Sequence, residues 1–504
     1  MNMKRAIVSS ILIVGMMLIS TYVFAQSETD LLYQQAQEFE KKAYYQKAYK
    51  TYKKARERYL EIGDLEKAKA CRIRVHQIEK IFVDYPHSKE AAVKLLGENF
   101  SYVSKDERNS WLEKGKIGFI TSNGQPFYFA NFVANLKYRN PRLKKKDSKF
   151  IEAETEFLRK YQDLVFKYPG SGYSPQAWKP YINPVTFLAS ASLPIPRGEL
   201  PEVGLLKIWI PLPVQTGAQD NIRVISIMPE KYVKIPPRVE GDIGRAYLEI
   251  PLEQLKEDLN IRLQFIFTHY EQRFIVDPEN VGEYDKESDL YKKYTRSYGN
   301  TTITPEIREK AREIVGDEKN PYLAAKRIYD YIVENVDYSL MPHYKLNVLG
   351  QPESVYVQEN LHGDCGGQGI YFSALCRSLG IPARTTGGMQ LCPGMENMHF
   401  WAEFYLPNYG WIPADSSVAQ IADTPPELTE NQRKTFKEFF FGSQDPYRYV
   451  IQKDVDVPLT PQPDEPVLLP MAIQFPAVVC ETSEENPNFL ALKYWKIEFK
   501  PVHR

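Results

Sequence analysis

The chain has 504 residues, the length of about three domains of ordinary size. Its 64 Lys and Arg residues balance its 64 Asp and Glu residues, so the formal net charge is zero. This balance argues against nucleic acid as the main partner, because phosphate binding requires a surplus of basic residues. A hydrophobic content of 43% with 25% charged residues is typical of a globular protein rather than a membrane bundle or a disordered chain.

The first 25 residues have the three parts of a secretory signal. Two basic residues, Lys4 and Arg5, precede an apolar stretch over residues 6–24, and small side chains stand three and one positions before a cleavage site after Ala25. The alternative is an uncleaved anchor, since about 19 residues of this kind can just span a bilayer. We therefore expect an exported protein, periplasmic or extracellular, with a membrane as partner only if the segment stays uncleaved.

The cysteine content argues against a disulfide-stapled fold. Five cysteines are too few and too widely spaced for such a domain, and an odd number leaves at least one free thiol in an exported protein. No CxxC pair or His-rich cluster occurs, so we expect no metal site and no cofactor. Whether Cys376 and Cys392 form a disulfide stays open at this stage.

Residues 26–170 are expected to be helical. From Thr29 to about Phe100, apolar residues recur at helical spacing with Lys and Glu between them, and Gly63-Asp64 separates two helices. Small residues at the helix contacts and a break of this kind resemble a tetratricopeptide-type (TPR-like) hairpin. The region would either bind a protein partner or form a helical layer packed on the rest of the chain, and we favour the layer.

Residues 171–277 are expected to form a β-sandwich. Six prolines between positions 175 and 201 break helices, and short runs of period two follow. These runs cover residues 205–211, 223–227, 246–250 and 261–267. No residue in them indicates catalysis. Helical spacing then returns from Pro305 to about Val336.

Cys365 lies in a glycine-rich loop directly before a predicted helix. The loop reads Gly363-Asp364-Cys365-Gly366-Gly367, and residues 370–379 follow a helical spacing that stops at Gly380, a suitable C-cap. A sulfur at this place lies at the positive end of the helix dipole, near free backbone N–H groups. Both favour the thiolate, which is the nucleophilic form of cysteine.

A histidine and an aspartate follow on a predicted hairpin. Residues 399–406 alternate between two faces, a turn centres on Asn408, and the chain returns through residues 411–415. This geometry puts His399 and Asp415 on one face, where the carboxylate can orient the imidazole. Each residue alone is weak evidence, but together with Cys365 they supply a nucleophile, a base and an orienting group.

The stretch from Gly363 to Asp415 resembles the transglutaminase-like superfamily. The matching pieces are Gly363-Asp364-Cys365 and residues 374–384, 399–403 and 410–415. The resemblance implies a papain-like α+β core over about residues 300–460, in which Cys365 is the nucleophile, His399 the general base and acid, and Asp415 the orienting carboxylate. It also implies that the strands before this core are the β-sandwich of bacterial members.

The oxyanion donors of the site and the role of the C-terminal segment are the two remaining predictions. Thiol acyl transfer needs donors for the oxyanion, and the candidates beyond the backbone N–H of Cys365 are the side chains of Gln358 and Tyr356. The Pro-rich, acidic segment 461–504 is expected to wrap the catalytic core. The expected fold class is thus a multidomain α+β protein with TPR-like helices, a β-sandwich and a transglutaminase-like, papain-like core.

The chemistry implied by such a site is attack of the Cys365 thiolate on a peptide or protein amide, which gives a thioester. Water as acceptor makes the protein a cysteine protease or amidase, and a lysine amine makes it a cross-linking transglutaminase. We favour hydrolysis, by analogy with superfamily members outside the animal cross-linking enzymes. A catalytically silent binding scaffold is the remaining alternative, against which the intact triad argues.

Overall fold

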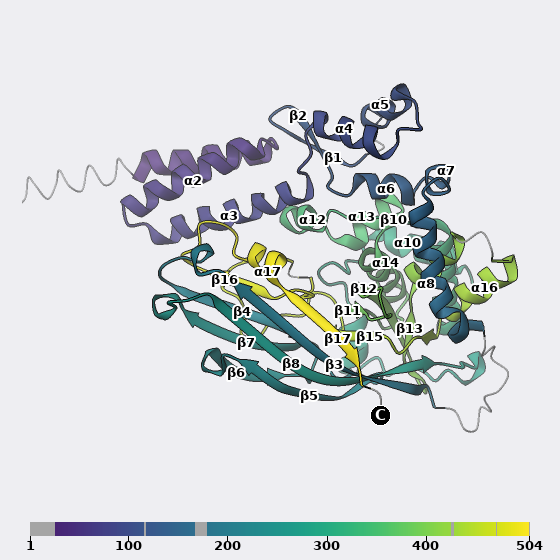
Figure 1. Ribbon diagram of the computed structural model, residues 1–504. Coiled ribbons are helices and arrows are strands. Elements are labelled where there is room, and N and C mark those ends of the chain that lie inside the picture. Colours follow the sequence, from purple (N-terminus) through teal and green to yellow (C-terminus); the bar gives the residue numbers. More distant parts are fainter. Residues whose placement is uncertain (1–25, 115–116, 167–178, 425–427, 470, 503–504) are drawn as a thin grey trace, which may run out of the picture. The chain divides into compact units, whose positions relative to one another are not determined.

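The computed structural model describes residues 26–114, 117–166, 179–424, 428–469 and 471–502 (Figure 1). The expected signal peptide, residues 1–25, lies outside the described residues. The chain divides into two compact units, one up to Phe132 with Glu484–Asn486 and one of Val133–Ser483 with the residues from Pro487 onward. Among the helices that the structure describes, none combines the length and the apolar character needed to cross a membrane.

The first unit is mainly helical. Residues 26–41 are helical, and the elements that follow are α2 (Tyr45–Glu61), α3 (Leu65–Asp84), α4 (Lys89–Asn99), α5 (Lys105–Glu113), β1 (Phe119–Ser122) and β2 (Gln125–Tyr128). The expected break between α2 and α3 is confirmed, because Gly63 has a φ of +76° and Asp64 caps α3 by accepting from the Lys67 N–H. The β1–β2 hairpin was not expected, although its Asn123-Gly124 turn is a strong hairpin signal. The TPR-like relationship stays a prediction.

The helices after Phe132 belong to the second unit. They are α6 (Phe132–Tyr138), α7 (Pro141–Lys144) and α8 (Ser148–Phe166). Four buried residues of α8, Phe157, Leu158, Tyr161 and Val165, share one hydrophobic core with the helices around Cys365. Helical periodicity shows that α8 has an apolar face, but it cannot show what that face packs against.

The expected β-sandwich is confirmed. Its strands are β3 (Tyr181–Ile195), β4 (Leu205–Leu212), β5 (Gln219–Met228), β6 (Val233–Arg238), β7 (Gly244–Pro251) and β8 (Leu259–Arg273). One sheet pairs β3 and β5 with β8, and the other pairs β4 and β6 with β7. Residues such as Phe187 and Phe265 from the first sheet and Trp209 and Leu248 from the second share one core, so the sheets pack face to face.

The C-terminal segment completes both sheets of the sandwich. Strand β16 (Ala477–Cys480) pairs with β4, and after α17 (Asn488–Tyr494) strand β17 (Lys496–Pro501) pairs with β3. The expectation that residues 461–504 wrap the catalytic core is therefore wrong for these elements. The sequence of a short strand such as β16 does not show which sheet it will join. Here the edge strands β3 and β4 have unpaired backbone N–H and C=O groups, and the C-terminal strands hydrogen-bond to them.

The region around Cys365 is an α+β layer structure. Its helices are α9 (Asp289–Thr295), α10 (Pro305–Val315), α11 (Pro321–Asn335), α12 (His343–Leu349), α13 (Glu353–Asn360), α14 (Cys365–Ser378), α15 (Ser416–Ala419) and α16 (Glu430–Phe439). Its strands are β9 (Asp337–Tyr338), β10 (His362–Gly363), β11 (Ala383–Gln390), β12 (Asn397–Leu406), β13 (Gly410–Ala414) and β15 (Arg448–Gln452), whereas β14 (Ser443–Gln444) pairs with β8 of the sandwich. The sheet order is β13-β12-β11-β15, and α14 packs on β11 and β12. Because α14 is buried from Gly366 to Ser378, it is the central helix of this region.

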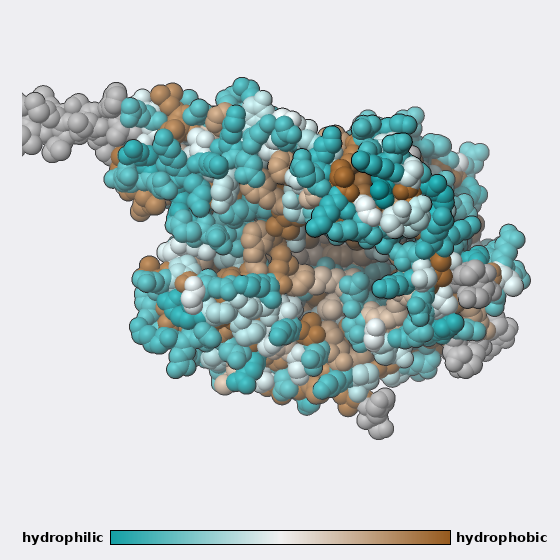
Figure 2. All heavy atoms as spheres, turned by 45° about the horizontal axis from the view of Figure 1, so that its top comes forward, coloured by the Kyte–Doolittle hydropathy of each residue, from teal (hydrophilic) through white to brown (hydrophobic). Residues whose placement is uncertain are grey.

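Large apolar side chains gather in the interior rather than on the surface. Figure 2 shows one face on which hydrophilic residues predominate, while hydrophobic residues gather mainly toward its middle. The exposed large apolar residues, such as Leu31, Val203 and Leu349, come from different elements. Single exposed apolar residues of this kind are ordinary on protein surfaces.

Candidate active site

Cys365 is the first residue of the central helix α14. The preceding Asp364 caps this helix, since its Oδ1 accepts the N–H of Gly367 at 3.0 Å. The glycines at the start of α14 allow close packing, because a Cβ at Gly367 would collide with Sδ of Met341 and one at Gly369 would lie 2.9 Å from Cγ2 of Thr385. The glycine-rich sequence thus lets the start of α14 sit deep between its neighbours, with Cys365 partly exposed.

His399 and Asp415 form the hydrogen bond expected from the sequence. The β12–β13 hairpin turns at Asn408, as Leu406 pairs with Gly410 and Ala402 with Ala414. Strand β13 ends at Ala414, and Asp415 then caps α15. In this position its Oδ2 lies 2.8 Å from Nε2 of His399.

Arg448, the first residue of β15, is a further partner of Asp415. Its Nη1 donates to Oδ2 of Asp415 at 2.9 Å, and its Nη2 donates to Oδ2 of Asp445 at 2.6 Å. All three side chains are buried. Burial alone would raise the pKa of Asp415, but the charges of His399 and Arg448 lower it to about 2. Asp415 is therefore ionised at neutral pH.

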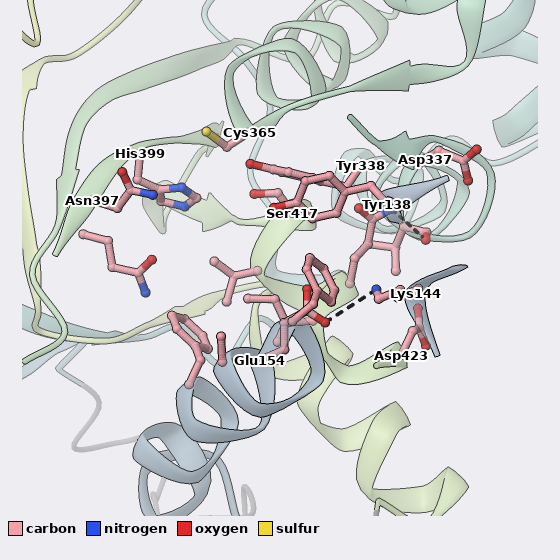
Figure 3. A pocket seen from close by; sticks show the side chains of 18 of the residues that line it. Tyr138, Lys144, Glu154, Asp337, Tyr338, Cys365, Asn397, His399, Ser417 and Asp423 are labelled. Carbon is pink, nitrogen blue, oxygen red and sulfur yellow. Dashed lines mark hydrogen bonds and ion pairs between the residues drawn. The ribbon is translucent and has the colours of Figure 1, made fainter. Parts of the chain in front are cut away.

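Cys365 and His399 line a cavity of about 650 Å³. Figure 3 shows the two side chains together at one end, with Lys144, Glu154 and Asp423 at the other. Lys144 and Glu154, which belong to α7 and α8, form an ion pair at 3.5 Å. The helices between 133 and 166, which lie outside the resemblance, thus supply one wall of the cavity.

The electrostatic surroundings of Cys365 differ from the expectation. Burial raises the pKa of the thiol and the charge of Asp364 acts in the same direction, while the N–H groups of Phe400 and Gly366 favour the thiolate. Burial thus opposes the effect that the helix N-terminus is expected to have on this thiol. Ionisation of this sulfur requires a base that takes its proton within the cavity, and His399 is the imidazole that lines it.

Gln358 and Tyr356 do not face the cavity. Oε1 of Gln358 accepts from the hydroxyl of Tyr371 at 2.5 Å, and the hydroxyl of Tyr356 lies 3.5 Å from Nε2 of His362. Neither residue lines the space next to Cys365. Both residues belong to α13, which lies close to Cys365 in the sequence. Their side chains, however, contact Tyr371 and His362 instead of the sulfur. The two oxyanion candidates are thus not brought to the sulfur.

Two tyrosines that sequence reasoning missed do line the cavity with Cys365. They are Tyr138 at the end of α6 and Tyr338 in β9, whose rings are in edge contact. Burial raises the pKa of Tyr138 to about 12, with the charges of Glu154 and Cys365 adding to the effect. Burial also raises the pKa of Tyr338, and Cys365 is the next largest contributor. No local signal marks Tyr138, because it precedes Cys365 by more than 200 residues.

The structure also answers the disulfide question. All five cysteines are free thiols. Cys376, in α14, and Cys392, just after β11, are both buried in the core of the second unit.

A family model matches the region around these residues. Residues 308–416 match the family model of the transglutaminase-like superfamily. A protein of Haemophilus influenzae that is described only as uncharacterized is 23% identical over 314 residues, which are 55% of this chain and 81% of that protein.

Solved structures show weaker similarities. A candidate cysteine protease from Cytophaga hutchinsonii is 14% identical, with a TM-score of 0.36, and the match covers 64% of this chain and 89% of that one. The periplasmic domain of TgpA from Pseudomonas aeruginosa is 13% identical, with a TM-score of 0.24, and the match covers 50% and 92%. On the family match, residues 308–416 of this chain are a transglutaminase-like domain, and they contain Cys365, His399 and Asp415.

Proposed function

We propose that the protein is an exported thiol enzyme that attacks a peptide or protein amide with Cys365 and hydrolyses the resulting thioester. The observation that carries the proposal is the shared cavity of Cys365 and His399, with His399 held by an ionised carboxylate. The N-terminal sequence supports export, because residues 1–25 have the composition of a cleavable signal.

In the proposed acylation step, Cys365 is the nucleophile, His399 transfers the proton and Asp415 orients His399. Nε2 of His399 is engaged by Asp415, so Nδ1 is the nitrogen that takes the proton of the Cys365 thiol. The thiolate attacks the amide carbon, and the backbone N–H of Cys365 stabilises the oxyanion. The imidazolium then returns its proton to the leaving amine, and the acyl group stays on sulfur as a thioester. Asp415 stabilises the imidazolium between these transfers.

Deacylation repeats the sequence with water as the nucleophile. His399 takes a proton from water, the hydroxide attacks the thioester carbon, and Cys365 leaves and recovers its proton from the imidazolium. The product is a carboxylic acid. If a lysine amine replaces water, the same thioester gives a cross-link, and the presence of an added amine in the assay separates the two reactions.

Iodoacetamide labelling of Cys365 tests the proposal without knowledge of the substrate. We expect labelling at neutral pH in the wild type and a loss of about 100-fold or more in His399→Ala, since a positioned base contributes at least that factor. Mass spectrometry of the labelled peptide identifies the site, and Cys480→Ala, which removes a buried thiol of strand β16, is the matched control.

Peptide hydrolysis is the second measurement. We expect Cys365→Ala to abolish it while the circular dichroism spectrum is retained. A folded wild type whose labelling rate does not depend on His399 would contradict the enzyme and favour a silent scaffold. Incorporation of a primary amine in place of hydrolysis would favour the cross-linking reaction.

A further inference from the structure

His343, at the start of α12, hydrogen-bonds to two carboxylates at once. Nδ1 lies 2.6 Å from Oε1 of Glu353, and Nε2 lies 2.6 Å from Oδ2 of Asp364. A neutral imidazole has a single N–H and can donate to only one of them. Both carboxylate side chains are buried, with 2% of Glu353 and 9% of Asp364 exposed. The geometry therefore fits an imidazolium held between two carboxylates.

The charges of this cluster support the same state. Burial alone would lower the pKa of His343, but Asp364 and Glu353 raise it well above its usual value. Burial alone would raise the pKa of Asp364, yet His343 and the N–H groups of Gly367 and Met341 lower it. A further carboxylate, Asp456, lies within the field of Glu353. His343 is thus a cation in direct contact with both Glu353 and Asp364.

Asp364 connects the cluster to the nucleophile. One of its oxygens caps α14 through Gly367, and the residue directly precedes Cys365. The cap orders the start of the helix, but its negative charge opposes formation of the thiolate. The other groups around the sulfur are His399, Asp415, Tyr138 and Tyr338. A cation bound to Oδ2 of Asp364 would leave Oδ1 in its capping position. It would also reduce the effect of the Asp364 charge on the pKa of Cys365.

We propose that His343 is a positioning residue of the Cys365 site, whose imidazolium holds Asp364 in the capping position and compensates its charge beside the sulfur. The inference rests on Cys365 being the nucleophile of the proposed function, and it does not depend on whether water or an amine accepts the acyl group. His343 is not among the described residues that line the cavity, and it acts through Asp364.

The test is the pH profile of Cys365 labelling by iodoacetamide in four proteins. We expect His343→Gln to move the profile to higher pH and to lower the rate at pH 7 by about tenfold, since a neighbouring charge shifts a pKa by about one unit or more. Asp364→Asn should move the profile to lower pH. The double variant His343→Gln, Asp364→Asn should recover the rate lost in His343→Gln, because it lacks both the positive charge of His343 and the negative charge of Asp364.

Matched controls separate this effect from a loss of structure. His362→Gln removes a neighbouring histidine whose pKa burial lowers to about 4, so it is neutral, and we expect no shift of the profile. Thermal unfolding confirms that each variant is folded. If His343→Gln does not fold, His343→Asn, which also replaces the imidazolium by a neutral side chain, should move the profile in the same direction.

The outcomes distinguish the two proposals. A wild-type profile that does not depend on His399 overturns the proposed function itself. An activated wild type whose profile is unchanged in folded His343→Gln overturns only the role of His343. A loss in His343→Gln that Asp364→Asn does not relieve also overturns it, because it would show a structural effect without charge compensation.

Discussion

One carboxylate oxygen of Asp415 contacts both the base His399 and the cation Arg448. Its Oδ2 contacts both Nε2 of His399 and Nη1 of Arg448, and Arg448 is held in turn by Asp445. The guanidinium also lies over the ring of Trp401, which stacks against His399 with centroids 6.0 Å apart. The orientation of His399 therefore depends on a buried ion network and not on Asp415 alone.

Removal of Arg448 should be costly. Arg448→Met leaves Asp415 and Asp445 buried without their cation, and we expect the free energy of unfolding to fall by about 3–5 kcal/mol in urea titrations. Arg448→Lys should recover part of the loss, since it keeps the charge but not the planar fork. Adding Asp445→Asn to Arg448→Met should also recover stability. Equal stability of wild type and Arg448→Met would show that the network does not hold Asp415.

At the level of elements, the approach of β15 to β11 brings Arg448 to the site. The pairing of these strands shifts register between Gly387 and Gly388. A Cβ at Gly388 would overlap the backbone carbonyl of Tyr449, the residue after Arg448. Backbone cannot rotate away as a flexible side chain can, so only glycine permits this spacing.

Gly388→Ala should therefore displace β15. We expect a loss of about 3 kcal/mol or more in the free energy of unfolding, at the upper end of overpacking effects, together with reduced labelling of Cys365. Gly198→Ala is the matched control in the same unit, because a Cβ there meets nothing within 4 Å. It should change stability by no more than about 0.5 kcal/mol. Similar stabilities for both variants would refute the argument.

Across the whole second unit, the sandwich and the sheet beside the active site share a core. Met389, Tyr449 and Ile451 from β11 and β15 lie in the same cluster as the inner residues of β3 and β8. His269 of β8 is fully buried at this junction, and burial together with the charge of Arg448 lowers its pKa to about 3. A histidine in this state links the stability of the unit to pH.

Acid should destabilise this unit through His269. The unfolded chain binds a proton near pH 6.5 and the folded chain only near pH 3, so stability is lost as pH falls through this range, by up to about 5 kcal/mol. His269→Gln should flatten the dependence of the unfolding free energy on pH between about 6.5 and 3. Above about pH 7.5 the unfolding free energies of the wild type and of His269→Gln should depend on pH in the same way. An unchanged slope in the variant would exclude His269 as the linked group.

The sequence by itself determined the parts of this protein that depend on short-range patterns. Period-two runs located β4, β5, β7 and β8 of the sandwich but not β3 or β6, and the Gly-Asp break located the turn between α2 and α3. The pairing of His399 with Asp415 was predictable because only 16 positions and one hairpin turn separate them. Helical spacing after Cys365 likewise located α14.

Tertiary structure alone decided which distant residues meet these elements. Arg448, Tyr138 and His343 come from elements whose own sequences give no sign of what they contact, and the C-terminal strands found their partners in the sandwich. The two oxyanion candidates near Cys365 in sequence point elsewhere for the same reason. The direction of the Cys365 pKa shift also depended on the fold, because the dipole of a helix is a local property, whereas burial and neighbouring charges arise only when the chain is packed.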